Sequence, residues 1–503
     1  MSYAELTRNV AEINDVLNAL SVLTWDARTQ MPPGGVETRG HQLGTLSGLA
    51  RRMILSGELR QALEGAEREV SGEEPDGVRA RTVQQVRGAV EVFSRIPADL
   101  VGDMAALKSV AQAAWGEARA TDDFSRFQPY LERMLELTRQ LAEAIGYAGH
   151  PYDALLAQYE PGMTTLSLRA LLDKLKLATL PLVQAIGEKG PPRWDFLTRD
   201  YPEDLQRSFA LGIAQKFGYD LSRGRLDTSL HPFEISFTRQ DVRITTRFRR
   251  DYLPMCLFGV LHETGHALYE QGVSPQLTRT ALTTDFLGLY AVGGASYGTH
   301  ESQSRLWENL VGRSRAFWQV HFPALQATFP EQLRDVDAQA FYHAVNRVTP
   351  SLIRVEADEL TYNFHILLRV ELEIALMDGR LAVGDLPEAW NAKVKEYLGL
   401  EVPSDTLGVL QDIHWSAGLF GSFPTYTIGN VMSAQFFAAA REQVGGLEEA
   451  LAAGDYVPLL QWLQHNIYQH GRRFSPQELL ERSTGQPLTT APYLRYLKGK
   501  YTV

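Results

Sequence analysis

Apolar positions in the first half of the chain recur at helical spacing. Between residues 131 and 145 apolar side chains return every three or four positions, and charged side chains occupy the opposite face. Gly146, Gly149 and Pro151 follow directly and predict that this helix ends there. The predicted apolar stripe consists of Leu131, Met134, Leu135, Thr138, Leu141, Ala142 and Ile145.

One segment departs from the helical pattern. Residues 234–248 alternate roughly between apolar and polar side chains, which is typical of short β-strands and favours a hairpin. Helical patterning returns after Pro254 and dominates to the end of the chain. Because no Gly/Ser-rich linker or internal repeat interrupts the pattern, we expect residues 1–503 to form a single, mainly helical domain with a small sheet.

The longest uncharged stretch runs from Trp415 to Ala440 and has the length of a membrane span. Its polar residues and glycines favour a buried interior segment instead. The first residues include Glu5 and Arg8, and they lack the basic and apolar regions of a signal peptide. We therefore expect a protein with no membrane association.

Composition narrows the function classes. The 503 residues carry 49 Lys and Arg against 60 Asp and Glu, a net charge of −11, which argues against a nucleic-acid partner. The single cysteine, Cys256, excludes an internal disulfide and a cysteine-based zinc site. One cysteine also fits a reducing compartment, so a cytoplasmic location is expected.

The strongest chemical signal is His262-Glu263-Thr264-Gly265-His266, an HExxH pattern. Residues four apart lie on one helix face, where two imidazoles can hold a Zn²⁺ ion beside the Glu263 carboxylate. Pro254 can open this helix, and Gly265 weakens it by about 1 kcal/mol relative to Ala. The alternative is a surface helix with two solvated histidines, which the apolar flanks of the motif disfavour.

A catalytic zinc ion needs a third protein ligand and one open position. Gly272 excludes the layout in which a third histidine follows the motif at that position. Asp285 lies 19 residues after His266, and Glu301 lies 35 residues after it. We favour Glu301, because it follows a glycine-rich run and is expected in the first turn of a new helix; spacing alone leaves Asp285 open.

Three further polar patterns stand out. Arg354, Asp358, Thr361 and His365 fall on one line if residues 351–369 form a helix. This line predicts either an Arg354–Asp358 pair on a solvated face or an arginine clamp for a carboxylate.

The second pattern lies on the predicted strand, where Asp241, Arg243 and Thr245 face one way. They could orient a zinc-bound imidazole, or they could form an ordinary polar sheet face. A third cluster ends at His414 and Trp415, a pairing that is more typical of packing than of catalysis.

Taken together, these motifs resemble those of the carboxypeptidase Taq family of thermostable metallocarboxypeptidases. The resemblance extends in the same order from about residue 20 to 440, without a departure at a motif position. The matching segments are Trp25-Asp26, Met31-Pro32, Tyr159 to Met163, His231 to Phe233, Asp241 to Thr245, His262 to His266, His300 to Gln303, Ile353 to Asp358 and Gly408 to Trp415.

The resemblance implies a mostly helical fold, similar in outline to neurolysin and angiotensin-converting enzyme, with a deep groove between two lobes and a small sheet beside the zinc helix. It implies His262, His266 and Glu301 as metal ligands and Glu263 as the carboxylate that activates a zinc-bound water. The implied activity is release of single residues from the free C-terminus of peptides, with broad specificity and Pro disfavoured. The implied assembly is a homodimer, and cobalt also suits such a site.

The remaining roles are hypotheses about the substrate. We expect Arg354 to bind the terminal carboxylate of the peptide, with Arg243 and Arg305 as alternatives. Tyr426 and His300 are candidates to stabilise the oxyanion. Two other functions stay open: an endo-oligopeptidase with the same zinc site, and a helical binding scaffold without metal.

Overall fold

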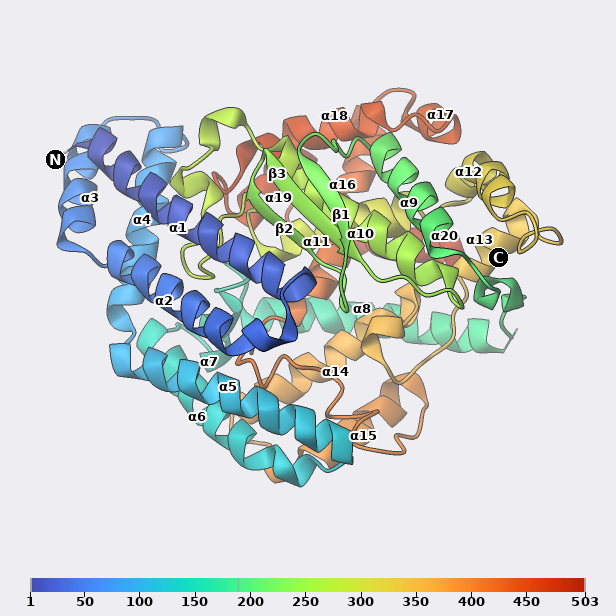
Figure 1. The fold of residues 1–503 in the computed structure, drawn as a ribbon, viewed down its shortest axis with the longest axis horizontal. Helices are drawn as coiled ribbons and strands as arrows, with labels where there is room; N and C mark the ends of the chain where they lie inside the picture. Colours follow the sequence, from blue (N-terminus) through green and yellow to red (C-terminus); the bar gives the residue numbers. More distant parts are fainter. Residues whose placement is uncertain (1, 189, 502–503) are drawn as a thin grey trace. The chain divides into compact units, whose positions relative to one another are not determined.

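The computed structural model describes residues 2–188 and 190–501 (Figure 1). Within it the chain divides into two compact units, each built from three separated segments. The first unit takes in residues 1–93, 192–345 and 432–488; the second takes in residues 94–191, 346–431 and 489–503. The predicted groove between lobes and the predicted single domain stay predictions.

Both units are mainly helical, as predicted. Helices α4 (Val78–Arg95) and α16 (Pro424–Gln443) each run across a boundary between the units. The other helices of the first unit are α1 (Tyr3–Thr29), α2 (Val36–Ile54), α3 (Gly57–Val70), α9 (Glu203–Phe217), α10 (Leu253–Gly272), α11 (Tyr297–Arg305), α12 (Arg315–Thr328), α13 (Ala338–Val345), α17 (Leu447–Ala452), α18 (Val457–Asn466) and α19 (Pro476–Thr484). Those of the second unit are α5 (Ala98–Thr121), α6 (Gln128–Ile145), α7 (Pro151–Leu156), α8 (Thr165–Gly187), α14 (Glu359–Met377), α15 (Leu386–Leu398) and α20 (Ala491–Tyr501).

Helix α6 confirms the predicted apolar stripe. Of the seven stripe positions all but Leu141 are buried, and Leu137 is buried in addition. The helix ends at Gly146, whose φ of 86° is a left-handed conformation that favours glycine. The spacing of apolar residues therefore predicted both the buried face and the end of this helix.

The small sheet lies in the first unit and has the strand order β1-β3-β2. Strands β2 (Glu234–Thr238) and β3 (Asp241–Thr246) form the predicted antiparallel hairpin. Strand β1 (Gly224–Thr228), which the sequence analysis did not predict, pairs in parallel with β3. Phe233, Ile235 and Phe237 pack against Trp25 of α1, so alternation turns Glu234 to the opposite face.

The predicted helix over residues 351–369 is wrong in its first half. Helix α14 begins at Glu359, because the Asp358 side chain caps it by accepting hydrogen bonds from the backbone N–H groups of Leu360 and Thr361. Arg354 belongs to a short 3₁₀ turn, Arg354–Glu356. The predicted polar line is therefore broken between Arg354 and Asp358.

The uncharged segment from Trp415 to Ala440 is an interior one, as predicted. Its second half forms most of α16, where Thr427, Asn430 and Ser433 are buried. Across the described residues, no helix combines the length and the apolar character that crossing a bilayer requires.

Tyr468, near the C-terminal end of the first unit, packs beneath α10 and α11. Its hydroxyl group donates to Gln303 Oε1 at 3.0 Å, and its ring stacks on Tyr269 with centroids 5.0 Å apart. The approach is close, since a Cβ atom added at Gly272 would lie 2.7 Å from the Tyr468 side chain. Tyr468, which comes late in the chain, thus supports α10 and α11, two helices from the middle of the chain.

Candidate metal centre

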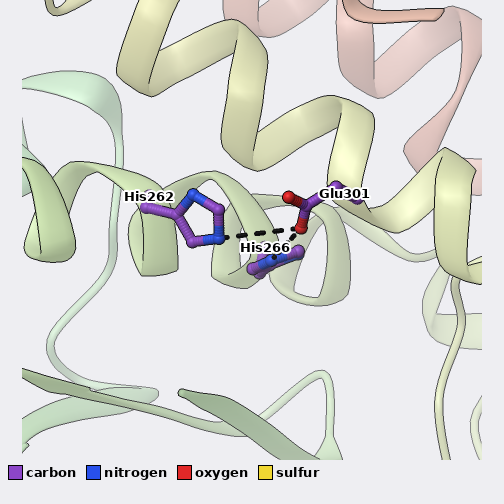
Figure 2. A group of neighbouring side chains, drawn as sticks. All are labelled: His262, His266 and Glu301. Carbon is purple, nitrogen blue, oxygen red and sulfur yellow. Dashed lines mark ion pairs between the residues drawn. The ribbon is translucent and has the colours of Figure 1, made fainter. Parts of the chain in front are cut away.

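Helix α10 presents the HExxH motif, as predicted. Pro254 lies in its first turn, where its missing N–H costs nothing, and Leu257, Leu261 and Leu268 are buried along its length. His262 and His266 lie one turn apart on the same side of the helix, and both rings point toward Glu301 from the facing helix (Figure 2). The four-residue spacing of the two histidines thus places both imidazoles on one side of α10.

Gly265 allows α10 and α11 to approach each other closely. A Cβ atom at this position would lie 2.4 Å from the backbone oxygen of Gln303 and 2.6 Å from Cα of Ser304. Both obstacles are backbone atoms, so a rotamer change cannot relieve the overlap. Gly265 has a lower helix propensity than Ala. This loss of helix stability is offset by the close contact between α10 and α11, which places Glu301 opposite the two histidines.

We expect Gly265→Ala to weaken metal binding by at least tenfold and to destabilise the fold by about 1–3 kcal/mol, because α11 must shift away from α10. The matched control is Gly212→Ala in α9, where an added Cβ would meet nothing within 4 Å. That control should gain stability by up to about 1 kcal/mol, as Ala usually does in a helix. Isothermal titration with zinc and thermal unfolding of both variants would measure the difference, and equal behaviour would refute the steric argument.

Glu301 completes a group of three potential ligands with His262 and His266. It is the fifth residue of α11, which begins after Ser296, whose hydroxyl group accepts a hydrogen bond from the Thr299 N–H at 2.9 Å. Glu301 Oε2 lies 3.6 Å from His262 Nε2 and 3.3 Å from His266 Nε2. Among the described residues this is the only group of three or more His, Cys, Asp or Glu residues with ligand atoms close enough to share a metal ion.

The separations fit a zinc ion. Ligand bonds of about 2.0–2.1 Å in tetrahedral geometry place neighbouring ligand atoms about 3.3–3.4 Å apart. The measured 3.3 and 3.6 Å agree with that spacing. Two imidazoles and a carboxylate also match the ligand set of a catalytic site that keeps one position open.

The contacts of Glu308 with His262 and of Arg305 with Glu301 were not predicted from the sequence. His262 Nδ1 lies 2.9 Å from Glu308 Oε2, and Arg305 Nε donates to Glu301 Oε1 at 2.7 Å. Glu308 belongs to η6 (Leu306–Val311), a π-helical segment that continues directly from α11. In the sequence Glu308 is marked only by its position seven residues after Glu301. That spacing does not predict a contact with His262 unless the π-helical geometry is known.

His300 lies directly beside the potential metal ligands. Its ring stacks on the His266 ring with centroids 4.5 Å apart, and its Nε2 lies 3.0 Å from Glu270 Oε1. Glu270 in turn accepts hydrogen bonds from the backbone N–H groups of Gly293 and Gly294. Since Nε2 faces a carboxylate here, a role for His300 at an oxyanion would have to come from Nδ1.

Glu263 is buried, with 6% of its surface exposed, and its carboxylate has no hydrogen bond or ion pair with any described residue. The nearby guanidinium group of Arg28 attracts it electrostatically. Arg28 stacks over the Phe233 ring at 3.5 Å from its centroid. Sequence analysis did not single out Arg28, although it follows the family-like Trp25-Asp26 motif.

The ionisation states of Glu301 and His266 suit a metal site. Burial alone would raise the pKa of the Glu301 carboxyl, but Arg305 and the two histidines outweigh it and hold that pKa below its ordinary value. Burial lowers the pKa of His266 to about 3. Near neutral pH Glu301 is therefore ionised and His266 neutral, the forms that bind metals. Burial raises the pKa of Glu263 to about 7, a suitable value for proton transfer near neutrality.

Asp285, the other candidate for the third ligand, lies outside this group, and the choice between it and Glu301 stays a prediction. It is buried, its Oδ1 lies 3.6 Å from Arg472 Nη2, and its backbone forms a bridge with Tyr290.

Arg243 faces away from the α10 side of the sheet. It forms a bidentate pair with Asp241, with two N–O distances of 2.8 Å, and its guanidinium group stacks on Trp25 and Phe237. Thr245 instead accepts a hydrogen bond from the Phe233 N–H. The polar side of β3 therefore packs toward Trp25 of α1. The partner of the His262 imidazole is Glu308, and not a residue of β3.

The second unit contains a buried charged cluster around Arg354. Asp412 Oδ1 accepts hydrogen bonds from Arg354 Nε at 3.0 Å and Nη2 at 2.8 Å, and Asp412 Oδ2 accepts from Arg369 Nε at 2.7 Å. Arg354 Nη1 also donates to the Tyr362 hydroxyl group at 3.1 Å. Two guanidinium groups share one carboxylate, so these three groups carry one excess positive charge.

Tyr426 borders this cluster. Its ring lies 5.2 Å from Arg354 Cζ, and its hydroxyl group is 3.3 Å from His414 Nε2. Burial lowers the pKa of His414 to about 4, so this imidazole is neutral near pH 7 and adds no charge to the cluster.

Comparisons with known proteins find relatives along nearly the whole chain. The family model of the carboxypeptidase Taq (M32) metallopeptidases matches residues 5–501. Thermostable carboxypeptidase 1 of Thermus thermophilus is 43% identical over 491 residues, covering 96% of this chain and 94% of the relative. Carboxypeptidase 1 of Bacillus subtilis is 36% identical, covering 97% and 96%. The crystal structure of an M32 carboxypeptidase from Deinococcus radiodurans has a TM-score of 0.95 at 44% identity, covering 99% of this chain and 98% of that one.

Proposed function

Since the chain belongs to the carboxypeptidase Taq family of metallopeptidases, we propose that it is a zinc carboxypeptidase that releases single residues from peptides with a free C-terminus. The observation that carries the proposal is the convergence of His262, His266 and Glu301 on one point with separations that suit zinc. When bound there, the metal polarises the scissile carbonyl group and makes water nucleophilic near neutral pH.

Glu263 acts as the general base in this proposal. Its carboxylate accepts a proton from the attacking water and then delivers that proton to the nitrogen atom of the leaving amino acid. Its burial, its freedom from hydrogen bonds to described residues and its pKa near 7 all support this exchange. The proton moves between water, Glu263 and the amine, so the carboxylate is regenerated in each cycle.

Arg354 binds the terminal carboxylate of the peptide in this proposal. The excess positive charge of its cluster with Asp412 and Arg369 favours an added anion. The two alternatives are less suited, since Arg243 is paired with Asp241 and Arg305 with Glu301. Tyr426, beside Arg354, is proposed to donate a hydrogen bond to the oxyanion.

We expect Arg354→Ala to lower kcat/KM for a free-acid peptide by about 10- to 100-fold, the cost of losing hydrogen bonds to a charged group. The same peptide with a C-terminal amide should be affected much less. Asp412 keeps Arg369 as a partner in this variant, which limits the structural damage. Arg243→Ala serves as the control and should affect both peptides equally; a selective loss in that variant would transfer the role to Arg243.

Several finer properties follow the family resemblance: broad specificity with Pro disfavoured, a homodimer, and a cytoplasmic location consistent with the single, buried Cys256. Light scattering of the purified protein tests the dimer.

The function itself is tested by metal analysis together with mass spectrometry of the products. Sequential loss of single C-terminal residues from a free peptide supports the proposal, and internal cleavage of an amide-blocked peptide would indicate an endo-oligopeptidase instead.

A further inference from the structure

The ring nitrogen of His262 that faces away from the metal position has a dedicated partner. Nδ1 lies 2.9 Å from Glu308 Oε2, and the Glu308 side chain is 11% exposed. An ionised carboxylate can only accept a hydrogen bond, so the proton of a neutral His262 resides on Nδ1. The lone pair of Nε2 is then directed at Glu301 and the metal position.

Two arginines hold Glu308 in place. Arg313 Nη2 donates to Glu308 Oε1 at 3.0 Å, and Arg305 Nη1 lies 3.5 Å from Glu308 Oε2. Arg305 also donates through Nε to Glu301 Oε1, the carboxylate oxygen that does not face the histidines. One guanidinium group therefore spans the carboxylate of the proposed ligand Glu301 and the carboxylate that supports His262.

The backbone that carries Glu308 departs from α-helical geometry. The segment η6 is π-helical over Leu306–Val311, and the Gly312 N–H donates to the Trp307 oxygen five residues earlier at 2.9 Å. π-helical turns are rare and are found frequently at functional sites. This one begins directly after Arg305 and contains Glu308, so it sets the reach of both side chains.

The second histidine lacks a comparable partner. His266 Nδ1 is buried and has no hydrogen-bond partner among the described residues. Its ring is held by stacking on His300 instead. The two imidazoles are thus supported unequally, by a charged hydrogen bond at His262 and by ring packing at His266.

We propose that Glu308 is a positioning residue that fixes the tautomer and orientation of His262, and that Arg305 and Arg313 hold Glu308 for this task. The proposal rests on the proposed function, since it assumes a metal ion at His262, His266 and Glu301. It assigns Arg305 to the metal centre and not to the substrate. An outer carboxylate of this kind commonly contributes 10- to 100-fold to metal affinity, as an order of magnitude.

The test is the dissociation constant for zinc, measured by competition with a chromophoric chelator, in the wild type and in Glu308→Gln and Glu308→Ala. We expect Glu308→Ala to weaken zinc binding about 10- to 100-fold. Glu308→Gln should weaken it less, because its amide oxygen can still accept from His262 Nδ1. The absorption spectrum of the cobalt-substituted Glu308→Ala protein should also change, since the ligand field depends on the orientation of His262.

Glu359→Gln provides the matched control. Glu359 is also a buried carboxylate paired with a cation, Lys500, at 2.6 Å, but it belongs to the second unit. Its substitution should lower thermal stability without changing the zinc dissociation constant. Circular dichroism of the metal-free variants shows whether each one folds, and the Gln variant keeps the test valid where the Ala variant does not fold.

The outcomes separate the two proposals. A wild-type protein that binds no zinc contradicts the proposed function itself. A wild type that binds zinc, with folded Glu308 variants of unchanged affinity and unchanged cobalt spectrum, overturns the role of Glu308 and leaves the proposed function standing.

Discussion

Glu263→Gln is expected to reduce kcat for peptide hydrolysis by about 10²- to 10⁴-fold, the usual contribution of a general base, while the protein still binds zinc. Gln has nearly the same shape as Glu but cannot accept and release the proton. The Glu263 side chain has no hydrogen bond to a described residue, so the amide disrupts no network. It also removes a negative charge beside the carboxylates of Glu301 and Glu308, so the fold should be no less stable than in the wild type.

Single-turnover kinetics with a free-acid peptide and zinc analysis by mass spectrometry would measure the two effects on the same preparation. Loss of zinc together with activity would make Glu263 a structural part of the centre. Retained activity at full zinc content would remove Glu263 from the mechanism.

Glu301→Ala is expected to abolish stoichiometric zinc binding, and with it activity. Loss of one of three ligands should weaken binding by more than the roughly 100-fold that an outer residue contributes. The matched variant is Asp285→Ala, which also removes a buried carboxylate beside an arginine, Arg472. Zinc content after dialysis should be near wild type for Asp285→Ala and near zero for Glu301→Ala.

The reverse pattern would return the third ligand to Asp285. Equal zinc loss in both variants, with unfolding by circular dichroism, would point to general destabilisation. Activity assays in excess zinc add a second criterion. If Glu301 is the ligand, a folded Asp285→Ala protein should be active under these conditions and Glu301→Ala should remain inactive.

Sequence reasoning was most accurate where the physical cause was local. The HExxH helix follows from its own apolar spacing and from Pro254, and the hairpin follows from alternation over a few residues. Glu301 was preferred over Asp285 because a helix was expected to fix it, and α11 does carry it. These inferences required only contacts between neighbours in the sequence.

Long-range pairings could not be predicted in this way. The partner of Arg354 is Asp412, 58 residues later, whereas spacing suggested Asp358 on a continuous helix. An Asp residue is a typical N-cap, so Asp358 was compatible with a helix that begins after it, and the spacing from Arg354 alone did not show this. Glu308 was missed because α-helical spacing contains no information about a π-helical turn.

The support that Tyr468 gives to α10 and α11 has a consequence for biosynthesis. A ribosome that has translated the HExxH helix and Glu301 has still to add more than 160 residues before Tyr468 appears. Until then the nascent chain lacks the ring that stacks on Tyr269 and the hydroxyl group that donates to Gln303. The helices that carry its proposed zinc ligands are therefore not fully packed. Zinc should therefore be acquired late, once Tyr468 has packed against these helices, and truncations that remove residue 468 should produce proteins that cannot retain the metal.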